Sequence, residues 1–228
     1  MITSEWPTSE HPNWVPFLVQ QVNYLQKAGI DIDVLPFRGS KNLINYLKAW
    51  HEARRVLHNG HYDLIHAQFG QSGLVALPQP VPLVVTFHGS DLQGDVSSNG
   101  LYTFQGQVLK IVSKFVALVA DEVIVVSSSL GQFMRRKTSC QVIPCGIDLD
   151  LFQPMDQIAV RQQLNLPQDI KLILFGGRPE MPIKRYGLAR QAVNLLRDRD
   201  VEMIALSKVP HDQMPLYLNA CDVLLLTS

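Results

Sequence analysis

The 228-residue sequence has only three cysteines, Cys140, Cys145 and Cys221. Their number is odd and no two of them form a C-x-x-C pair, so the sequence indicates neither a disulfide framework nor a cysteine-type zinc site. Few unpaired cysteines are typical of proteins that work in a reducing compartment. We therefore expect a cytoplasmic protein.

The sequence also lacks an excess of either charge and an uninterrupted hydrophobic run. Lys plus Arg and Asp plus Glu each number 20, so nothing in the charge balance argues for bulk binding to nucleic acid or to an acidic membrane. The most apolar segment, residues 108–126, contains four charged residues, and it is too interrupted to span a bilayer. The N-terminus has neither the basic region nor the apolar region of a secretory signal peptide.

What the sequence does contain is an alternation of strand-like and helix-like segments. Apolar residues make up 46% and charged residues 18%, as in folded globular chains. Three runs, DLIHAQF, PLVVTFHG and DEVIVVSSS, are apolar at consecutive positions, as parallel strands covered on both faces are. A fourth run, QVIPCG, closes this block. The sequence therefore predicts an α/β fold with a parallel sheet.

Three helices are predicted in the first 120 residues, from apolar residues that recur every three or four positions. The second of them covers residues 41–58, and Arg54 lies on its stripe, where it either borders a cleft or extends along the surface. The predicted stripes are Val15, Leu18, Val22 and Leu25, then Leu43, Leu47, Trp50 and Leu57, then Val108, Val112, Phe115 and Val119.

The pattern starts again after Pro154. A short helix near residues 160–164 precedes strand KLILFGG, helix GLARQAVNLL, strand VEMIAL, a helical turn and strand DVLLLTS. We therefore predict two domains, residues 1–150 and 151–228, the second of them incomplete. Residues 2–6 read as the end of a first strand, so we expect the native protein to extend beyond Ser228 and upstream of Met1.

Five stretches of the chain, in order, resemble those of one enzyme family. They are TSEWP with QQVNYLQKAGIDIDVL, DLIHAQFGQSG with PLVVTFHGSD, VIPCGIDLDLF, LFGGRPEMPIKRYGLARQAV, and VPHDQMPLYLNACDVLLLTS. Together they are similar to the family 4 (group 1) retaining glycosyltransferases of the GT-B fold, which has two Rossmann-like domains. The resemblance implies an N-terminal acceptor-side domain and the first part of a C-terminal nucleotide-sugar-binding domain. Cys145 stands where the family's I-P-N-G signature has asparagine, and its E-x7-E region would start after Ser228.

The resemblance also implies a reaction and its participants. The protein would be a retaining hexosyl or glycosyl transferase of polysaccharide biosynthesis, moving a sugar from a nucleotide-sugar donor to a saccharide or lipid-linked acceptor. It would use no metal ion and no cofactor, and it would not bind nucleic acid. A lipid-linked acceptor would add peripheral membrane association at the inner face of the membrane. The oligomeric state stays open.

The predicted donor site lies in the second domain. A departing diphosphate must be neutralised by cations and backbone N–H groups that are already in place. Arg178 and Lys184 follow an apolar strand that ends at Gly176 and Gly177, and their loop ends where a helix begins. Arginine offers a two-pronged donor, lysine a mobile charge and the helix start a partial positive charge. Taken alone, Arg178 and Lys184 would be ordinary surface cations. In the family's G-R-x-x-x-x-x-K pattern, however, we assign both of them and the two glycines to donor binding, and the two cations also to catalysis.

The predicted acceptor side lies in the first domain. His88 follows the strand PLVVTF, where it can hydrogen-bond the transferred sugar or stabilise charge near its C1 atom, and we place it among the catalytic residues. His66 and Gln68 end another strand and face the acceptor in this interpretation. Asp91 is assigned to the cleft, although an aspartate after Gly-Ser is equally suited to capping a helix.

Gly146 is assigned to the donor site as a turn at which the backbone approaches the ligand or acts as a hinge. Cys145 has no histidine neighbour in the sequence, so we do not expect it to act as a nucleophile. One alternative, an NAD-dependent oxidoreductase, would need a G-x-G-x-x-G loop between a strand and a helix, which the sequence lacks. A non-catalytic module that binds sugar or nucleotide stays open as a second alternative.

Overall fold

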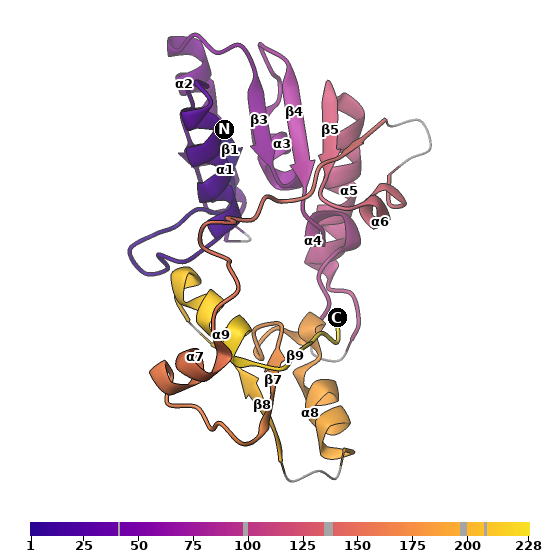
Figure 1. The fold of residues 1–228 in the computed structure, drawn as a ribbon. Coiled ribbons are helices and arrows are strands. Elements are labelled where there is room, and N and C mark those ends of the chain that lie inside the picture. Colours follow the sequence, from indigo (N-terminus) through magenta and orange to yellow (C-terminus); the bar gives the residue numbers. More distant parts are fainter. Residues whose placement is uncertain (41, 98–99, 135–138, 197–199, 208) are drawn as a thin grey trace. The chain divides into compact units, whose positions relative to one another are not determined.

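The computed structural model describes the chain except residues 41, 98–99, 135–138, 197–199 and 208. It divides into two compact units (Figure 1). Unit 1 comprises Met1–Asp95 and Tyr102–Gly146, and unit 2 comprises Val96–Leu101 and Ile147–Ser228. Among the helices of the described residues, none has both the length and the apolar character needed to cross a membrane.

Unit 1 is built on a six-stranded parallel sheet in the order β2-β1-β3-β4-β5-β6. The first strand lies between β2 and β3, so the order of strands reverses there, and such points are where open α/β sheets bind ligands beyond the strand C-termini. In chain order the elements are β1 (Ile2–Thr3), α1 (Pro16–Lys27), β2 (Leu35–Pro36), α2 (Leu43–Asn59), β3 (Ile65–Gln68), α3 (Gly70–Ala76), β4 (Leu83–Phe87), α4 (Ser90–Gln93), α5 (Phe104–Val119), β5 (Glu122–Val125), α6 (Ser128–Gly131) and β6 (Gln141–Val142).

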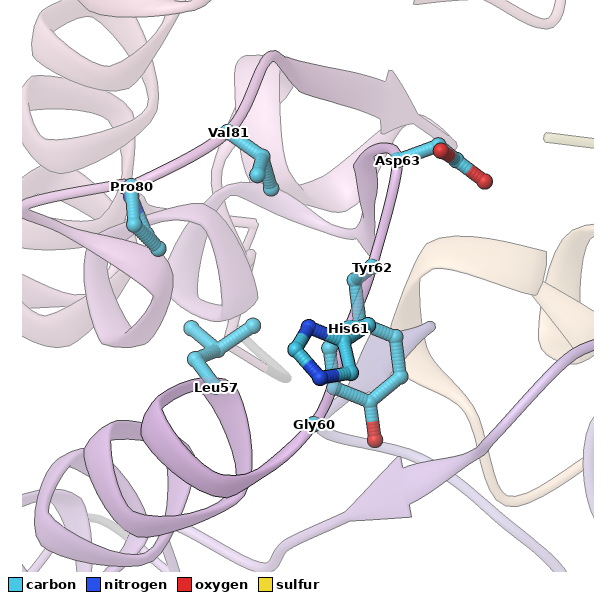
Figure 2. Close-up of a pocket in the computed structure, with 7 residues that line it drawn as sticks. All are labelled: Leu57, Gly60, His61, Tyr62, Asp63, Pro80 and Val81. Atoms are coloured by element: carbon cyan, nitrogen blue, oxygen red, sulfur yellow. The ribbon is translucent and has the colours of Figure 1, made fainter.

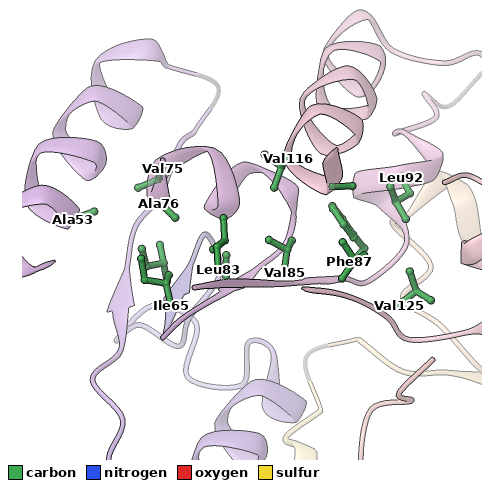
Figure 3. Packing of buried hydrophobic residues seen from close by; sticks show 14 of the residues in the cluster. Ala53, Ile65, Val75, Ala76, Leu83, Val85, Phe87, Leu92, Val116 and Val125 are labelled. Atoms are coloured by element: carbon green, nitrogen blue, oxygen red, sulfur yellow. The ribbon is translucent and has the colours of Figure 1, made fainter. Parts of the chain in front are cut away.

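The core of unit 1 lies between the central strands and three helices. The apolar runs predicted as parallel strands are β3, β4 and β5, and their alternate residues are buried, as Leu83, Val85 and Phe87 of β4 illustrate. Figure 3 shows Ala53 of α2 and Val116 of α5 on the same side of these strands, with α3 between the two helices. The predicted parallel sheet with apolar strands is therefore confirmed.

The buried faces of two helices are not the predicted ones. In α1, Leu18 and Val22 of the predicted stripe are buried. In α2 and α5, the described residues that are buried are small or medium-sized. Of the predicted stripes, Leu57 and Val112 are partly buried and pack against the core, and the others are exposed. Exposed are Leu43, Leu47 and Trp50 of α2 and Val108, Phe115 and Val119 of α5; buried are Ala49 and Ala53 of α2 and Gly106, Ser113, Val116 and Ala117 of α5. Lys41 of the second predicted helix lies outside the described residues.

Close packing of α3 against α5 explains the difference. A Cβ atom added at Gly70 of α3 would overlap the Ser113 side chain, and one added at Gly73 would overlap Val116. The two helices therefore approach at a distance that only small side chains allow. Arg54 of α2 donates hydrogen bonds to the carbonyls of Ala76 and Pro78, so of its two predicted roles it takes neither a cleft position nor a solvated one.

Unit 2 contains a three-stranded parallel sheet in the order β8-β7-β9, with the predicted order of elements. These are α7 (Gln157–Gln163), β7 (Lys171–Phe175), the 3-10 helix η1 (Pro182–Lys184), α8 (Tyr186–Asn194), β8 (Val201–Ala205), the 3-10 helix η2 (His211–Gln213), α9 (Met214–Ala220) and β9 (Val223–Leu225).

A buried arginine ties these elements together. Arg161 of α7 donates to the Ala220 carbonyl and to Asp222 Oδ2, both at 2.8 Å, and to two carbonyls of the loop before β7. Asp222 Oδ2 also accepts from the backbone N–H of Leu172 at 2.7 Å. One side chain thereby fixes the starts of β7 and β9 against α7.

Candidate functional site

Polar side chains gather at the C-terminal ends of β3 and β4 in unit 1. Gln68 of β3 is opposite Thr86 of β4, and both are buried. His66 Nε2 lies 2.8 Å from Thr86 Oγ1 and 3.3 Å from Gln68 Nε2, while Gln68 Oε1 lies 2.8 Å from His88 Nε2. The structure therefore brings the two predicted histidines together, with Gln68 as the link between them.

The orientation of the Gln68 amide determines which nitrogen of His88 carries its proton. Gln68 Nε2 donates to Gln21 Oε1 of α1 at 2.9 Å, so its carbonyl oxygen faces His88. His88 must then hold its proton on Nε2 and keep a lone pair on Nδ1. That Nδ1 atom lies 3.9 Å from Cys145 Sγ, a contact that was not predicted from the sequence.

Two aromatic rings hold the imidazole of His88 in place. The ring of Phe17, from α1, lies 5.0 Å from the imidazole centroid, and the ring of Phe69 lies 4.6 Å from it. Phe69 has a φ of 72°, a backbone conformation that bulky residues rarely adopt. Strain of this kind costs about 1–3 kcal/mol and clusters at functional sites, so its position beside His88 supports a functional assignment.

Burial keeps both histidines neutral. It lowers the pKa of His66 and of His88 from 6.5 to about 4. A neutral imidazole can accept a hydrogen bond from a sugar hydroxyl, and it can also place its lone pair near positive charge that develops at C1. Both roles of His88 therefore stay predictions.

Asp91 supports the loop that carries His88. Its Oδ1 accepts from the backbone N–H of Gly89 at 2.9 Å and of Leu92 at 3.1 Å, and its Oδ2 accepts from that of His88 at 3.2 Å. The side chain is buried, and burial raises the pKa of this carboxyl. The contacts of Asp91 match the capping interpretation. Because its carboxylate accepts from the backbone N–H of His88, Asp91 positions that residue.

Two residues that end unit 1 complete this edge. Cys145 has a histidine neighbour in space, but burial raises the pKa of its thiol, which keeps the nucleophilic thiolate scarce. Gly146 is exposed, and a Cβ atom added there would meet no described atom within 4 Å. The described surroundings of Gly146 therefore do not require a glycine.

In unit 2, three of the four predicted donor residues meet at the C-terminal end of β7. A Cβ atom on Gly177 would lie 2.9 Å from Lys184 Cγ and Cδ, so the lysine stem lies directly over this glycine. Gly176 is packed equally closely against Leu226, which follows β9. Lys184 Nζ lies 3.5 Å from Ser228 Oγ.

The fourth donor residue, Arg178, is exposed at the start of the same loop, where its carbonyl accepts from Met181 N–H at 3.1 Å. Arg185, which joins η1 to α8, has a φ of 50°. A second strained backbone position therefore lies beside a predicted cation, Lys184.

Several members of the unit 1 site were missed in the sequence. Gln21, Thr86, Phe17 and Phe69 become visible only when α1, β3 and β4 are placed together. One signal was present: Gln68 and Thr86 interrupt strands that are otherwise apolar, and buried polar side chains need partners.

A pocket of about 260 Å³ lies at the other end of the unit 1 sheet (Figure 2). His61, Tyr62 and Asp63, which precede β3, line it together with Pro80 and Val81, which precede β4. It contains none of the predicted site residues. Across the described ranges, no group of three or more His, Cys, Asp or Glu side chains is arranged to hold a metal ion.

The family model described as Glycosyltransferase Family 4 matches residues 2–151 of this chain. A D-inositol 3-phosphate glycosyltransferase of Streptomyces scabiei is 29% identical over 210 residues, which are 85% of this chain and 44% of that protein. The chain thus spans less than half the length of this curated relative.

Two solved structures share the fold. Sucrose-phosphate synthase from Thermosynechococcus elongatus matches with a TM-score of 0.63 and 21% identity, over 86% of this chain and 60% of that one. Anabaena Alr3699/HepE, solved in complex with UDP, matches with a TM-score of 0.50 and 20% identity, over 89% and 62%. These likenesses confirm the predicted GT-B fold class of two Rossmann-like parallel-sheet units.

Proposed function

This chain belongs to Glycosyltransferase Family 4, and from that premise we propose that the protein moves a sugar from a nucleotide-sugar donor to a saccharide or lipid-linked acceptor with retention of configuration. The observation that carries the proposal is the neutral, oriented imidazole of His88 at the C-terminal edge of the unit 1 sheet. The matched region, residues 2–151, includes this site. We extend the proposal to a hexosyl donor, a cytoplasmic location and a role in polysaccharide biosynthesis.

In this proposal the two units do different work. Unit 1 supplies the hydrogen-bonding side: His88 Nδ1 accepts from a sugar hydroxyl, and the rings of Phe17 and Phe69 keep the imidazole from turning. Because Nε2–H is already bound to Gln68 Oε1, the substrate would bind the lone pair on Nδ1, in place of the long contact with Cys145 Sγ.

Unit 2 supplies the charge. Negative charge on the leaving diphosphate grows as the bond to the sugar breaks, and in this proposal Arg178 and Lys184 neutralise it. The stem of Lys184 lies over Gly177, so its ammonium group is held at the end of β7. These two cations carry out the part of the reaction that metal-free transfer requires.

Substitutions at these residues test donor binding by unit 2 separately from the hydrogen-bonding role of His88 in unit 1. Arg178→Ala and Lys184→Ala each remove charge-assisted hydrogen bonds of roughly 1.5–3 kcal/mol, so each should lower nucleoside diphosphate affinity by about 10- to 100-fold. His88→Leu should leave that affinity unchanged and lower sugar transfer. Calorimetry with UDP and GDP and a transfer assay with their hexose conjugates measure both. Arg190→Ala, which removes an exposed cation of α8, is the matched control.

Two outcomes would count against the proposal. If both cation variants bind nucleoside diphosphate like the wild type, the donor site is elsewhere. If the wild type binds the nucleotide sugar but neither transfers nor hydrolyses it with any acceptor offered, the protein is the non-catalytic binding module that Cys145, at the family's asparagine position, kept open.

A further inference from the structure

Helix α5 has its large apolar residues on the side away from the core. Its buried side consists of Gly106, Ser113, Val116 and Ala117. A helix at the surface of a globular domain normally turns its bulky apolar residues inward. In α5 the close approach of α3 reserves the inner side for small residues, and the bulky ones face outward.

The outward residues form one continuous row, which we call the outer stripe. Their spacing of four, three, four and three positions places them on one side of the helix. They are Phe104 (83% exposed), Val108 (43%), Ile111 (70%), Phe115 (49%) and Leu118 (48%). A row of exposed apolar side chains of this length marks a surface that interacts with something other than water.

Helix α2 shows the same feature on the same side of the sheet. Leu43, Ile44 and Leu47 are more than half exposed, and Leu74 of the intervening α3 is exposed as well. Figure 3 shows that α2, α3 and α5 cover one side of the strands. We call the outward surface of these three helices the helical face.

The helical face is basic, although the whole chain is neutral. Helices α2, α3 and α5 contain five Lys and Arg residues and one acidic residue, Glu52, whereas the rest of the chain contains 15 basic and 19 acidic residues. Four of the five cations belong to the outward surface, because the Arg54 guanidinium is bound to the carbonyls of Ala76 and Pro78. Glu52 pairs with Arg55, at 2.6 Å. Helix α5 itself carries Lys110 and Lys114 and no acidic residue.

We propose that the helical face binds an anionic lipid surface, with α5 lying in the plane of the interface. Exposed Phe, Ile and Leu side chains flanked by lysines are what an interfacial helix presents to a bilayer. Anionic head groups then attract each lysine with about 1 kcal/mol. This inference concerns where the protein binds, and it does not depend on the proposed sugar transfer.

Charge argues against a second copy of the chain as the occupant. A two-fold symmetric dimer would place the same basic surface on both sides of its interface. Juxtaposed like charges are costly at an interface. An anionic phospholipid surface offers negative charge to the lysines and an apolar layer to the exposed Phe, Ile and Leu side chains.

Vesicle co-sedimentation tests the proposal. The protein should bind vesicles of phosphatidylcholine mixed with phosphatidylglycerol and bind pure phosphatidylcholine much more weakly, at a salt concentration of about 0.1 M. Lys114→Gln should weaken binding about fivefold. Ile111→Gln should weaken it about tenfold, because it removes an apolar side chain from the bilayer interface.

The matched controls lie in unit 2. Ile158→Gln changes an isoleucine of α7 that is 61% exposed, and Arg190→Gln removes an exposed cation of α8; neither should affect vesicle binding. Circular dichroism confirms that each variant is folded. Equal binding to neutral and anionic vesicles, or no binding, would overturn the proposal. So would sedimentation equilibrium that shows a wild-type dimer converted to a monomer by Ile111→Gln.

Discussion

Acid should destabilise unit 1 because it contains two histidines that resist protonation. The unfolded chain takes up a proton at each histidine below about pH 6.5, whereas His66 and His88 in the native unit stay neutral down to about pH 4. Between these values the unfolded state holds more protons, so the free energy of unfolding falls as the pH falls.

The magnitude follows from the two pKa values. A drop from 6.5 to about 4 corresponds to about 3 kcal/mol for each histidine once the pH is below 4. From about pH 7 to about pH 5, each histidine accounts for about 2 kcal/mol, and the pair for about 4 kcal/mol. With a urea dependence of about 2 kcal/mol per molar, the urea midpoint should fall by about 2 M.

Tryptophan fluorescence can follow this transition selectively. The three tryptophans, Trp6, Trp14 and Trp50, all belong to unit 1, so the emission reports that unit alone. The double variant His66→Gln, His88→Gln should lose most of the difference between the two pH values. His51→Gln, which removes an exposed histidine of α2, should retain it. The raised pKa of the buried Asp91 carboxyl acts in the opposite direction and is common to both proteins, so a double variant whose midpoint falls as far as that of the wild type would refute the argument.

Two further predictions concern packing and a buried arginine. Gly70→Ala forces a methyl group against Ser113, so it should destabilise unit 1 by about 1–3 kcal/mol in the same fluorescence assay, whereas Gly146→Ala, at a site of unit 1 with open space, should leave the midpoint nearly unchanged. Arg161→Met removes the hydrogen bonds that the buried arginine donates to the Ala220 carbonyl and to Asp222, so it should destabilise unit 2 by about 1–3 kcal/mol, measured by far-ultraviolet circular dichroism. Arg161→Lys should lie between the wild type and Arg161→Met; an unchanged melt for Arg161→Met would show that the backbone contacts suffice.

The sequence predicted the strands better than the helix faces. Consecutive β-branched residues, as in β4 and β5, have one reasonable location in a parallel sheet, buried on both sides. A helical stripe has two possible locations, because periodicity identifies one side of a helix without showing whether that side faces the core or the solvent. In α5 the side that faces the core is determined by Gly70 and Gly73, which lie in another helix more than 30 positions earlier.

The sequence predicted where the candidate site lies, but not which side chains form hydrogen bonds with one another there. His88 could be placed at a strand end from the sequence, because polar residues that follow buried strands share one edge of a parallel sheet. His66 was predicted to end its strand and is instead the second residue of β3, from which its side chain reaches Thr86. The role of Gln68 could not, since it depends on the register of β3 against β4 and on the reach of Gln21 from α1. The neutral state of the histidines likewise follows from burial, which a linear pattern does not reveal.

The junction of α3 and α5 has a consequence for how this protein can diverge. On the inner half of α5, a side chain at position 70 can be accommodated only if Ser113 is replaced by a smaller residue, so these two positions must change together. The exposed outer half makes no such demand, and its residues can be exchanged one at a time while the sheet beneath is untouched. The residues of the proposed membrane-binding surface can therefore change during evolution, and with them the location of the protein, without loss of the folded state of unit 1.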